Sequence, residues 1–497
     1  MNIAQAKLEI RNCTEAYLAC DDLGRPRIPL ERQRPVLLLG APGIGKTAIV
    51  GQVAAEMGIG LVSYSMTHHT RQSALGLPFI TTKVYGGTEY RVSEYTMSEI
   101  VASVYDCMEA SGVRQGILFL DEVNCVSETL SPSMLQFLQF KTFGRHRIPD
   151  GWVVVCAGNP PEYNNSVHEF DVVTMDRLKR IDVEPDLEAW KTYARSQGTH
   201  PAILSYLSTR PEDFYKVQTT VDGKAFVTAR GWSDLSEMLV LYRELHIPAS
   251  ELLVSQYLQH RRVAQDFALY LDLYAKYRED YGIDAILEGR WETPVMERTR
   301  KARFDERLAV LGLVVDRLCA QAHEVMRLRA QASLLSTCVE EVAHALEGGL
   351  AFEEALASQI DTLDERTLAA RASNTVQPDQ EQALLVCRDL LEQARGAKDP
   401  DALSGLEELR GLVSKRQEAC EEEAALEGSC LEAAFAFVEE AFGDASQELL
   451  VFVTDLTVDP FSAQYIALYG CDKYFEHNEG LLFSERRRAL AAEVDAI

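Results

Sequence analysis

The sequence is short of positive charge. Its 497 residues carry 49 lysines and arginines against 76 aspartates and glutamates, which gives a formal net charge of −27. Such a chain repels phosphate backbones and anionic lipid unless a local basic stripe reverses the field. The densest basic cluster is only Arg486-Arg487-Arg488. The composition therefore argues against binding to nucleic acid.

Paired cysteines and long apolar runs are also missing. The eleven cysteines are scattered from Cys13 to Cys471, with no C-x-x-C pair and no histidine at metal-ligand spacing, so we expect reduced thiols. No uncharged apolar run approaches the ~20 residues that a membrane-spanning helix needs. Lys7, Glu9 and Arg11 stand where a signal peptide would need its apolar core. We therefore expect a cytoplasmic protein without membrane insertion.

The two halves of the chain differ in texture and in charge. Residues 1–250 carry 24 basic and 29 acidic side chains, whereas residues 251–497 carry 25 and 47. The first half alternates helical stretches with short, uncharged, β-rich runs at 35–40, 60–65, 117–120 and 152–158. Runs of this kind are typical of a buried parallel sheet flanked by helices.

The second half is almost entirely helical in pattern. Apolar residues recur at spacings of mostly four and three between 311 and 346, which predicts a coiled-coil-like seam ended by Gly348-Gly349. A polar stretch, 373–380, separates it from further helices near 381–395 and 401–442. We expect a helical hairpin that packs on itself, which is compatible with a partner-docking arm. The aromatic segment 449–478 is expected to fold back on a core.

One loop carries the strongest chemical signal. The string GAPGIGKT fits G-x-x-x-x-G-K-[ST] directly after an apolar strand and opens a helix. Glycines let backbone N–H groups turn inward around phosphates, and the helix N-terminus adds partial positive charge. Lys46 would reach the β- and γ-phosphates, and the Thr47 hydroxyl would bind Mg²⁺. The expected nucleotide-binding residues are Gly40, Ala41, Pro42, Gly43, Ile44, Gly45, Lys46, Thr47 and Ala48.

Polar residues end two further strands. Asp121 and Glu122 follow ILFL, and we expect Asp121 to hold Mg²⁺ and Glu122 to polarise the attacking water. Asn159 follows VVVCAG and could orient that water or merely cap the next turn. Arg177 lies in DRLKR before the short strand IDVEP, and Arg230 opens a helix in TARGW, where it could touch a nucleotide from a small helical lid.

Taken in order, GAPGIGKT, ILFLDE, VCAGNP, DRLKR and TARGW resemble the motifs of AAA+ ATPases, and AGNPPEYN resembles the MoxR branch of the helix-2-insert clade. The resemblance covers about residues 1–250. It implies an ATPase with ATP and Mg²⁺ as cofactors. It also implies that Asn159 is sensor 1, that Arg177 is the trans-acting arginine finger with Arg180 as a competing candidate, and that Arg230 is sensor 2.

The resemblance further implies assembly and partners. It implies a homo-oligomeric ring, commonly a hexamer, and a partner protein with a von Willebrand A domain. Two segments fit the inserts of that branch: 79–100, a hairpin around Gly86-Gly87 that would face the ring pore, and 141–152, a second loop or hairpin. Both could also be plain surface hairpins.

The sequence thus predicts an α/β P-loop AAA+ core with a parallel sheet, a small helical lid, and a long all-α coiled-coil-like C-terminal region. The expected ranges are 1–195 for the core, 196–300 for the lid and following helices, 301–442 for the helical arm, and 443–497 for the segment that packs back on a core. We expect a chaperone-like remodeller or activator of partner proteins. The alternatives are a nucleic-acid motor or restriction-type NTPase subunit, which the acidic charge disfavours, and an ATP-sensing scaffold, which the pair Asp121 and Glu122 disfavours.

Overall fold

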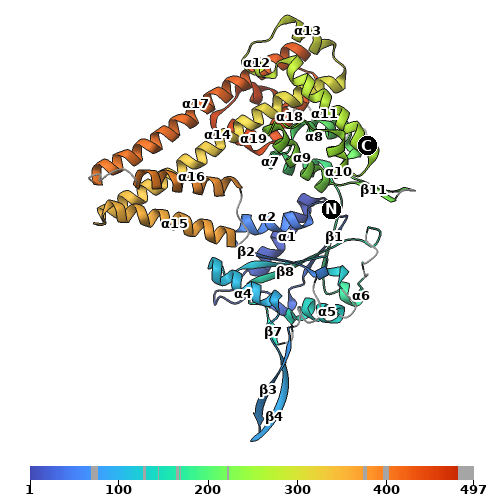
Figure 1. Ribbon diagram of the computed structural model, residues 1–497, viewed down its shortest axis with the longest axis vertical. Helices are drawn as coiled ribbons and strands as arrows, with labels where there is room; N and C mark the ends of the chain where they lie inside the picture. Colours follow the sequence, from blue (N-terminus) through green and yellow to red (C-terminus); the bar gives the residue numbers. More distant parts are fainter. Residues whose placement is uncertain are drawn as a thin grey trace, which may run out of the picture. The chain divides into compact units, whose positions relative to one another are not determined.

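The computed structural model describes residues 1–68, 76–126, 130–143, 145–163, 167, 170–220, 223–372, 378–395 and 402–478 (Figure 1). These residues form two compact units. The first comprises Met1–Ala189 and Asp361–Gln382, and the second comprises Trp190–Ile360 and the chain from Ala383 onward. Within the described residues, no helix has the length and apolar character needed to cross a bilayer.

The first unit is built on a five-stranded parallel sheet. Its strands are β1 (Val36–Gly40), β2 (Gly60–Ser65), β5 (Gly116–Asp121), β8 (Trp152–Gly158) and β9 (Lys179–Val183), in the order β2-β5-β8-β1-β9. Every residue of β8 is buried, as expected for a strand that is covered on both faces. The predicted α/β fold is confirmed, and because the strands are parallel their carboxyl ends meet at one edge.

Helices cover this sheet. They are α1 (Ile3–Leu18), α2 (Lys46–Met57), α4 (Glu99–Ser111), α5 (Ser131–Phe140) and the short α6 (Val172–Met175). The apolar faces of α4 and α5 meet the strands in one core, in which Val104 of α4 and Phe137 of α5 pack with Leu118 and Val154 of the sheet. Gly58 and Gly112 end α2 and α4 with left-handed backbone, as glycine does at helix C-termini.

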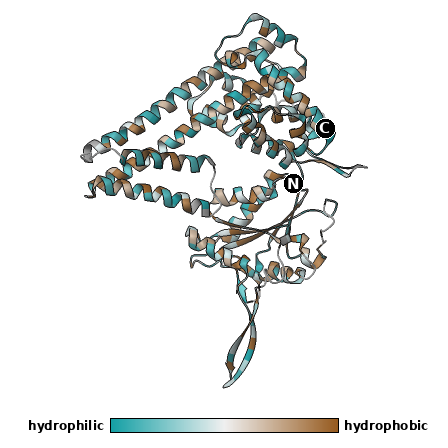
Figure 2. Ribbon diagram, viewed as in Figure 1, coloured by the Kyte–Doolittle hydropathy of each residue, from teal (hydrophilic) through white to brown (hydrophobic). Residues whose placement is uncertain are grey.

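Two hairpins leave the first unit where the sequence predicts them. Strands β3 (Pro78–Tyr85) and β4 (Thr88–Tyr95) pair antiparallel around Gly86 and Gly87, both with positive φ. Exposed apolar residues such as Ile80 and Val84 are interspersed with charged ones along this hairpin (Figure 2). The second hairpin, β6 (Thr142–Phe143) and β7 (His146–Arg147), is only two residues long on each side, and Gly144 lies outside the described residues.

The second unit begins with the predicted small helical region. It holds α8 (Pro201–Thr209), α9 (Ala229–Glu244), α10 (Glu251–Tyr257), α11 (Arg261–Tyr281), α12 (Ile283–Leu287) and α13 (Thr293–Lys301), while α7 (Leu187–Ser196) crosses from the first unit. Edge-to-face contacts join Tyr206, Trp232 and Phe267 at its centre. The sequence pattern missed the hairpin of β10 (Lys216–Thr220) and β11 (Gly223–Val227).

The long C-terminal helices form the predicted hairpin. Helix α14 (Phe304–Glu347) packs along α17 (Ala402–Phe442). The two run antiparallel, because Arg307 lies over Phe442 while the Val325 carbonyl meets the Cys420 thiol. Most of the predicted seam is buried, and Gly348 and Gly349 end α14. Helices α15 (Phe352–Ala372) and α16 (Pro378–Arg395) lie between them in the chain. Helix α16 begins three residues before the predicted start, and 373–377 lie outside the described residues.

One core joins most of the second unit. It combines Ala202 of α8, Tyr274 of α11, Val314 and Leu318 of α14, and Phe435 of α17 with residues of α18 (Gln447–Val458) and α19 (Pro460–Tyr469). Residues from the ranges 196–300, 301–442 and 443–497 therefore share one packed interior. The four domain ranges expected from the sequence stay a prediction, and the boundary near 300 falls inside this core.

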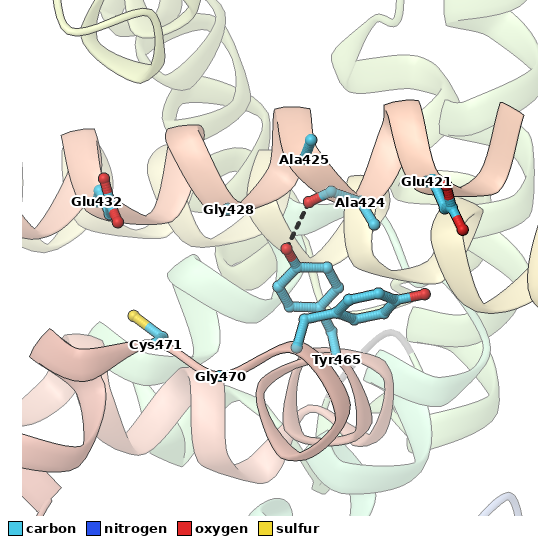
Figure 3. A pocket seen from close by; sticks show the side chains of 9 residues that line it. Glu421, Ala424, Ala425, Gly428, Glu432, Tyr465, Gly470 and Cys471 are labelled. Atoms are coloured by element: carbon cyan, nitrogen blue, oxygen red, sulfur yellow. Dashed lines mark hydrogen bonds between the residues drawn. The ribbon is translucent and has the colours of Figure 1, made fainter. Parts of the chain in front are cut away.

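Helix α19 docks on α17 through a tyrosine (Figure 3). The Tyr465 hydroxyl donates to the carbonyl oxygen of Ala424 at 2.5 Å, and a Cβ added to Gly428 would lie 3.2 Å from that hydroxyl. Burial raises the pKa of Tyr465 to about 12, so the phenol stays a donor. The small residues of α17 thus leave room for the aromatic ring, and an open pocket remains beside it, with Glu421 and Glu432 at its rim.

Candidate functional site

The glycine-rich loop lies between β1 and the first turn of α2, as predicted. Gly43 and Gly45 have φ values of 73° and 94°, a region that glycine enters without strain. A Cβ on Gly40 would lie 2.4 Å from the carbonyl oxygen of Val183 on β9, so only glycine fits there. The loop therefore turns its backbone toward the N-terminus of α2, where N–H groups and the helix dipole favour an anion.

Lys46 is held at the centre of this loop. Only 8% of the residue is exposed. Its Nζ donates to the carbonyl oxygens of Gly40 and Ala41, both at 2.8 Å, and to Oδ1 of Asn159 at 3.0 Å. The ammonium group thus connects the loop after β1 to the end of β8. The structure brings together two residues that are 113 positions apart in the chain.

Thr47 and Asp121, the two residues predicted to hold Mg²⁺, lie in direct contact. Thr47 Oγ1 donates to Asp121 Oδ2 at 2.9 Å, and the backbone N–H of Glu122 donates to Asp121 Oδ1 at 2.9 Å. A hydroxyl and a carboxylate are oxygen ligands of the kind that Mg²⁺ prefers. Among the residues that the structure describes, no group of three or more His, Cys, Asp or Glu could enclose a metal ion. The pair therefore fits a cation that draws its other ligands from phosphate and water.

Glu122 is turned toward β2. Its Oε2 accepts hydrogen bonds from Thr67 Oγ1 at 3.1 Å and Ser65 Oγ at 3.3 Å, at the end of that strand. In the sheet, β2 lies on one side of β5, whereas β8 and β1 lie on the other. The carboxylate consequently points away from the phosphate loop. Neither hydroxyl was predicted from the sequence, since no local motif marks them.

Asn159 is anchored by a second asparagine. Asn124 Nδ2 donates to the backbone oxygen of Asn159 at 2.8 Å. Asn124 belongs to η3 (Val123–Cys125), the turn that follows Glu122. Asn124 is not predicted from the sequence either, although its spacing of two positions from Glu122 could have indicated it.

The nearby thiols are not activated. Burial raises the pKa of Cys125, and the carboxylates of Glu122 and Asp121 raise it further. Burial likewise raises the pKa of Cys156 on β8. Since a cysteine nucleophile needs a lowered pKa, neither residue suits covalent catalysis.

The two finger candidates differ in their surroundings. Arg177 is exposed in the turn after α6. Arg180 lies within β9, which begins two residues earlier than the predicted strand IDVEP, and its Nε donates to Asp182 Oδ1 at 2.8 Å. The aspartate already pairs with Arg180, which makes Arg177 the better candidate. Its action on a neighbouring subunit stays a prediction.

Arg230 belongs to the second unit. It is exposed in the first turn of α9, where the Thr228 hydroxyl caps the helix by accepting from the N–H of Gly231 at 3.2 Å. Its proposed role as sensor 2 stays a prediction.

Residues 36–166 match the model of the AAA family, described as the ATPase family associated with various cellular activities. The matched range begins at β1 and includes Lys46, Thr47, Asp121, Glu122 and Asn159. A search of curated proteins finds no match to the chain. The family match therefore supports an AAA+ ATPase domain and reaches neither the MoxR branch nor the helix-2-insert clade.

Proposed function

From the AAA-type ATPase domain at residues 36–166, we propose that this chain is a MoxR-like AAA+ ATPase. It hydrolyses ATP at the subunit interfaces of a ring and thereby remodels or activates partner proteins. The observation that carries this proposal is the junction of Lys46 with Asn159 and of Thr47 with Asp121, by direct hydrogen bonds at the carboxyl ends of β1, β5 and β8.

Phosphate binding is the first task of these residues. The loop and the first turn of α2 present N–H groups to the β- and γ-phosphates. Lys46 exchanges carbonyl partners for phosphate oxygens, which gives charge-assisted bonds. Asn159 stays within reach of the same ammonium group and can sense the γ-phosphate.

Thr47 and Asp121 would hold Mg²⁺, which when bound neutralises charge on the phosphates. The contact between the two side chains keeps both oxygens near one point. Little rearrangement is then needed, so the ordering penalty of binding is small.

Glu122 is the proposed general base. A base must come within hydrogen-bond reach of the water that it activates. Because Ser65 and Thr67 hold its Oε2 on the β2 side, Glu122 has to leave these hydroxyls before it can act. The geometry thus supports an enzyme with a restrained resting state.

Ring assembly is part of the proposal because Arg177 would act in the site of a neighbouring subunit. Arg177 is exposed on the first unit, and we propose that it stabilises transition-state charge in the site of a neighbouring subunit. A hexamer with the β3–β4 hairpin facing the pore, a cytoplasmic location and a partner with a von Willebrand A domain are part of the same proposal. They rest on the resemblance of the motifs.

Two variants test the hydrolytic function. Lys46→Ala should abolish ATP binding and turnover. Glu122→Gln should retain ATP binding and lose about 10²-fold or more in turnover, because only the base is removed. Binding is measured by equilibrium titration with labelled ATP and turnover by phosphate release.

Ser98→Ala is a matched control, since Ser98 is a buried helix cap whose side chain accepts from the N–H of Val101 at 3.3 Å and touches no phosphate-site residue among the described contacts. It should lower thermal stability and leave kcat unchanged. Wild-type turnover in either Lys46→Ala or Glu122→Gln would contradict the assignment of the site.

A further inference from the structure

A run of contacts leads from the turn after Glu122 to the phosphate-binding lysine. Asn124 is only 5% exposed, and its Nδ2 donates to the backbone oxygen of Asn159 at 2.8 Å. The side chain of Asn159 in turn accepts from Lys46 Nζ at 3.0 Å. Asn124 therefore holds the backbone of Asn159, while the side chain of Asn159 contacts Lys46.

The strand before Asn159 fits closely against the same side chain. A Cβ added to Gly158 would lie 2.6 Å from Oδ1, 2.8 Å from Cγ and 3.1 Å from Nδ2 of Asn124, its three nearest atoms. Gly158 is not among the glycines with positive φ. Glycine is thus required here for space rather than for backbone freedom, and the space is filled by Asn124.

Stability alone does not account for an asparagine at this position. Its Oδ1 is buried and has no hydrogen-bond partner within the described part of the chain. An unpaired buried amide oxygen is unfavourable, so an apolar side chain of similar size would avoid that loss. What the asparagine adds is the N–H donor to Asn159.

We propose that Asn124 is a positioning residue, which holds the end of β8 so that Asn159 keeps its place at Lys46. The proposal rests on the ATP hydrolysis proposed above and adds a residue outside the phosphate loop and the acidic pair. Asn124 and Glu122 share one tight turn, in which the N–H of Cys125 donates to the carbonyl oxygen of Glu122. That turn therefore links the proposed base with the residue that senses the γ-phosphate.

The first test separates catalysis from binding. Asn124→Ala should lower kcat about 10- to 100-fold, because an error of about 1 Å in a reacting group has effects of this size. The Kd for ATP should change less than about threefold, since the loop residues, Thr47 and Asp121 keep their contacts. Phosphate release and equilibrium titration measure the two quantities.

The second test uses the tight fit at Gly158. Gly158→Ala alone should lower kcat about as much, because the new Cβ displaces Asn124. In the Asn124→Ala background the same change meets none of those three atoms, so it should alter kcat less than about twofold. The effects of the two changes are then non-additive.

The third test restores the donor by protonation. Asn124→Asp keeps the volume but places an oxygen against the carbonyl of Asn159. Burial raises the pKa of such an aspartate, and only its protonated form can donate. The ratio of variant to wild-type kcat should therefore rise as the pH falls from 8 to 6, a dependence that a purely structural role would not produce.

The outcomes distinguish this proposal from the function on which it rests. Absence of turnover in the wild-type protein would overturn the proposed function. Normal wild-type turnover with independent, multiplicative effects of Asn124→Ala and Gly158→Ala would overturn only the positioning role. So would a change confined to thermal stability, as expected for the control Ser98→Ala, or a flat pH ratio for Asn124→Asp.

Discussion

Releasing Glu122 from β2 should accelerate hydrolysis. Thr67 Oγ1 and Ser65 Oγ donate to Glu122 Oε2 at 3.1 and 3.3 Å, on the side of β5 opposite the phosphate loop. If Glu122 is the general base, as proposed, every turnover requires both bonds to break before the carboxylate can reach the attacking water. The variants Ser65→Ala and Thr67→Val remove the two donors with little change of volume.

The size of the effect follows from the exposure of the bonds. A hydrogen bond to a charged group contributes about 1.5–3 kcal/mol when buried. Thr67 is exposed and Ser65 is half-buried, so water competes and we take about 1 kcal/mol for each bond. Since about 1.4 kcal/mol corresponds to a factor of ten, a single variant should raise kcat about fivefold and the double variant about 30-fold.

Steady-state phosphate release at saturating ATP measures this gain. The two hydroxyl oxygens also lie 2.9 Å apart. Because each hydroxyl has a single proton, a bond between them competes with one of the bonds to Glu122, so the single effects need not add and the double variant is decisive. Thr67→Ser keeps a donor and should stay near the wild-type rate. A double variant that hydrolyses ATP at the wild-type rate or more slowly, with unchanged ATP affinity, would refute the restraint.

Three further predictions concern the rest of the chain. If Arg177 acts on a neighbouring subunit, mixing Arg177→Ala with Lys46→Ala protein should restore part of the turnover that each variant lacks alone. Arg180→Ala should keep its turnover without any mixing. If mixing restores no turnover, Arg177 is an exposed surface residue and not the arginine finger. Replacing 330–415 by a short loop removes Asp361–Gln382 of the first unit but no residue of the phosphate site, so ATPase activity should persist. Deleting 305–440 should unfold the second unit, because it removes Val314, Leu318 and Phe435 from the core. Circular dichroism and turnover distinguish the two outcomes. Burial raises the pKa of Glu427 to about 9, and the negative charge of Glu423 contributes in the same direction. The folded state therefore holds a proton that the unfolded state loses above about pH 4. The stability that neutral Glu427 contributes to the folded state is complete below that pH and is lost as the pH rises toward 9. Glu427→Gln should therefore raise the unfolding temperature more at pH 8 than at pH 5. An equal shift at both pH values would contradict a buried, neutral Glu427.

Local sequence determined the framework of this protein. The loop from Gly40 to Thr47, the acids after β5 and the asparagine after β8 were all recognisable because glycine spacing and strand-end polar residues act over a few positions. The helices of the second half are equally predictable, since an apolar seam with a period near 3.5 lies within a single helix and can be found in the local sequence. The β3–β4 hairpin follows from the strand-like runs on either side of Gly86-Gly87.

Only the tertiary structure decided which side chains meet. Strand order places β2 and β8 on opposite sides of β5, and it is this order that gives Glu122 the hydroxyls of Ser65 and Thr67 and gives Asn159 the amide of Asn124. It also decided that half of α14 belongs to a core shared with α8, α11, α18 and α19, where a sequence boundary near 300 was expected. The physical reason is that parallel pairing and helix packing join residues tens to hundreds of positions apart, and no local pattern records which neighbours they will find.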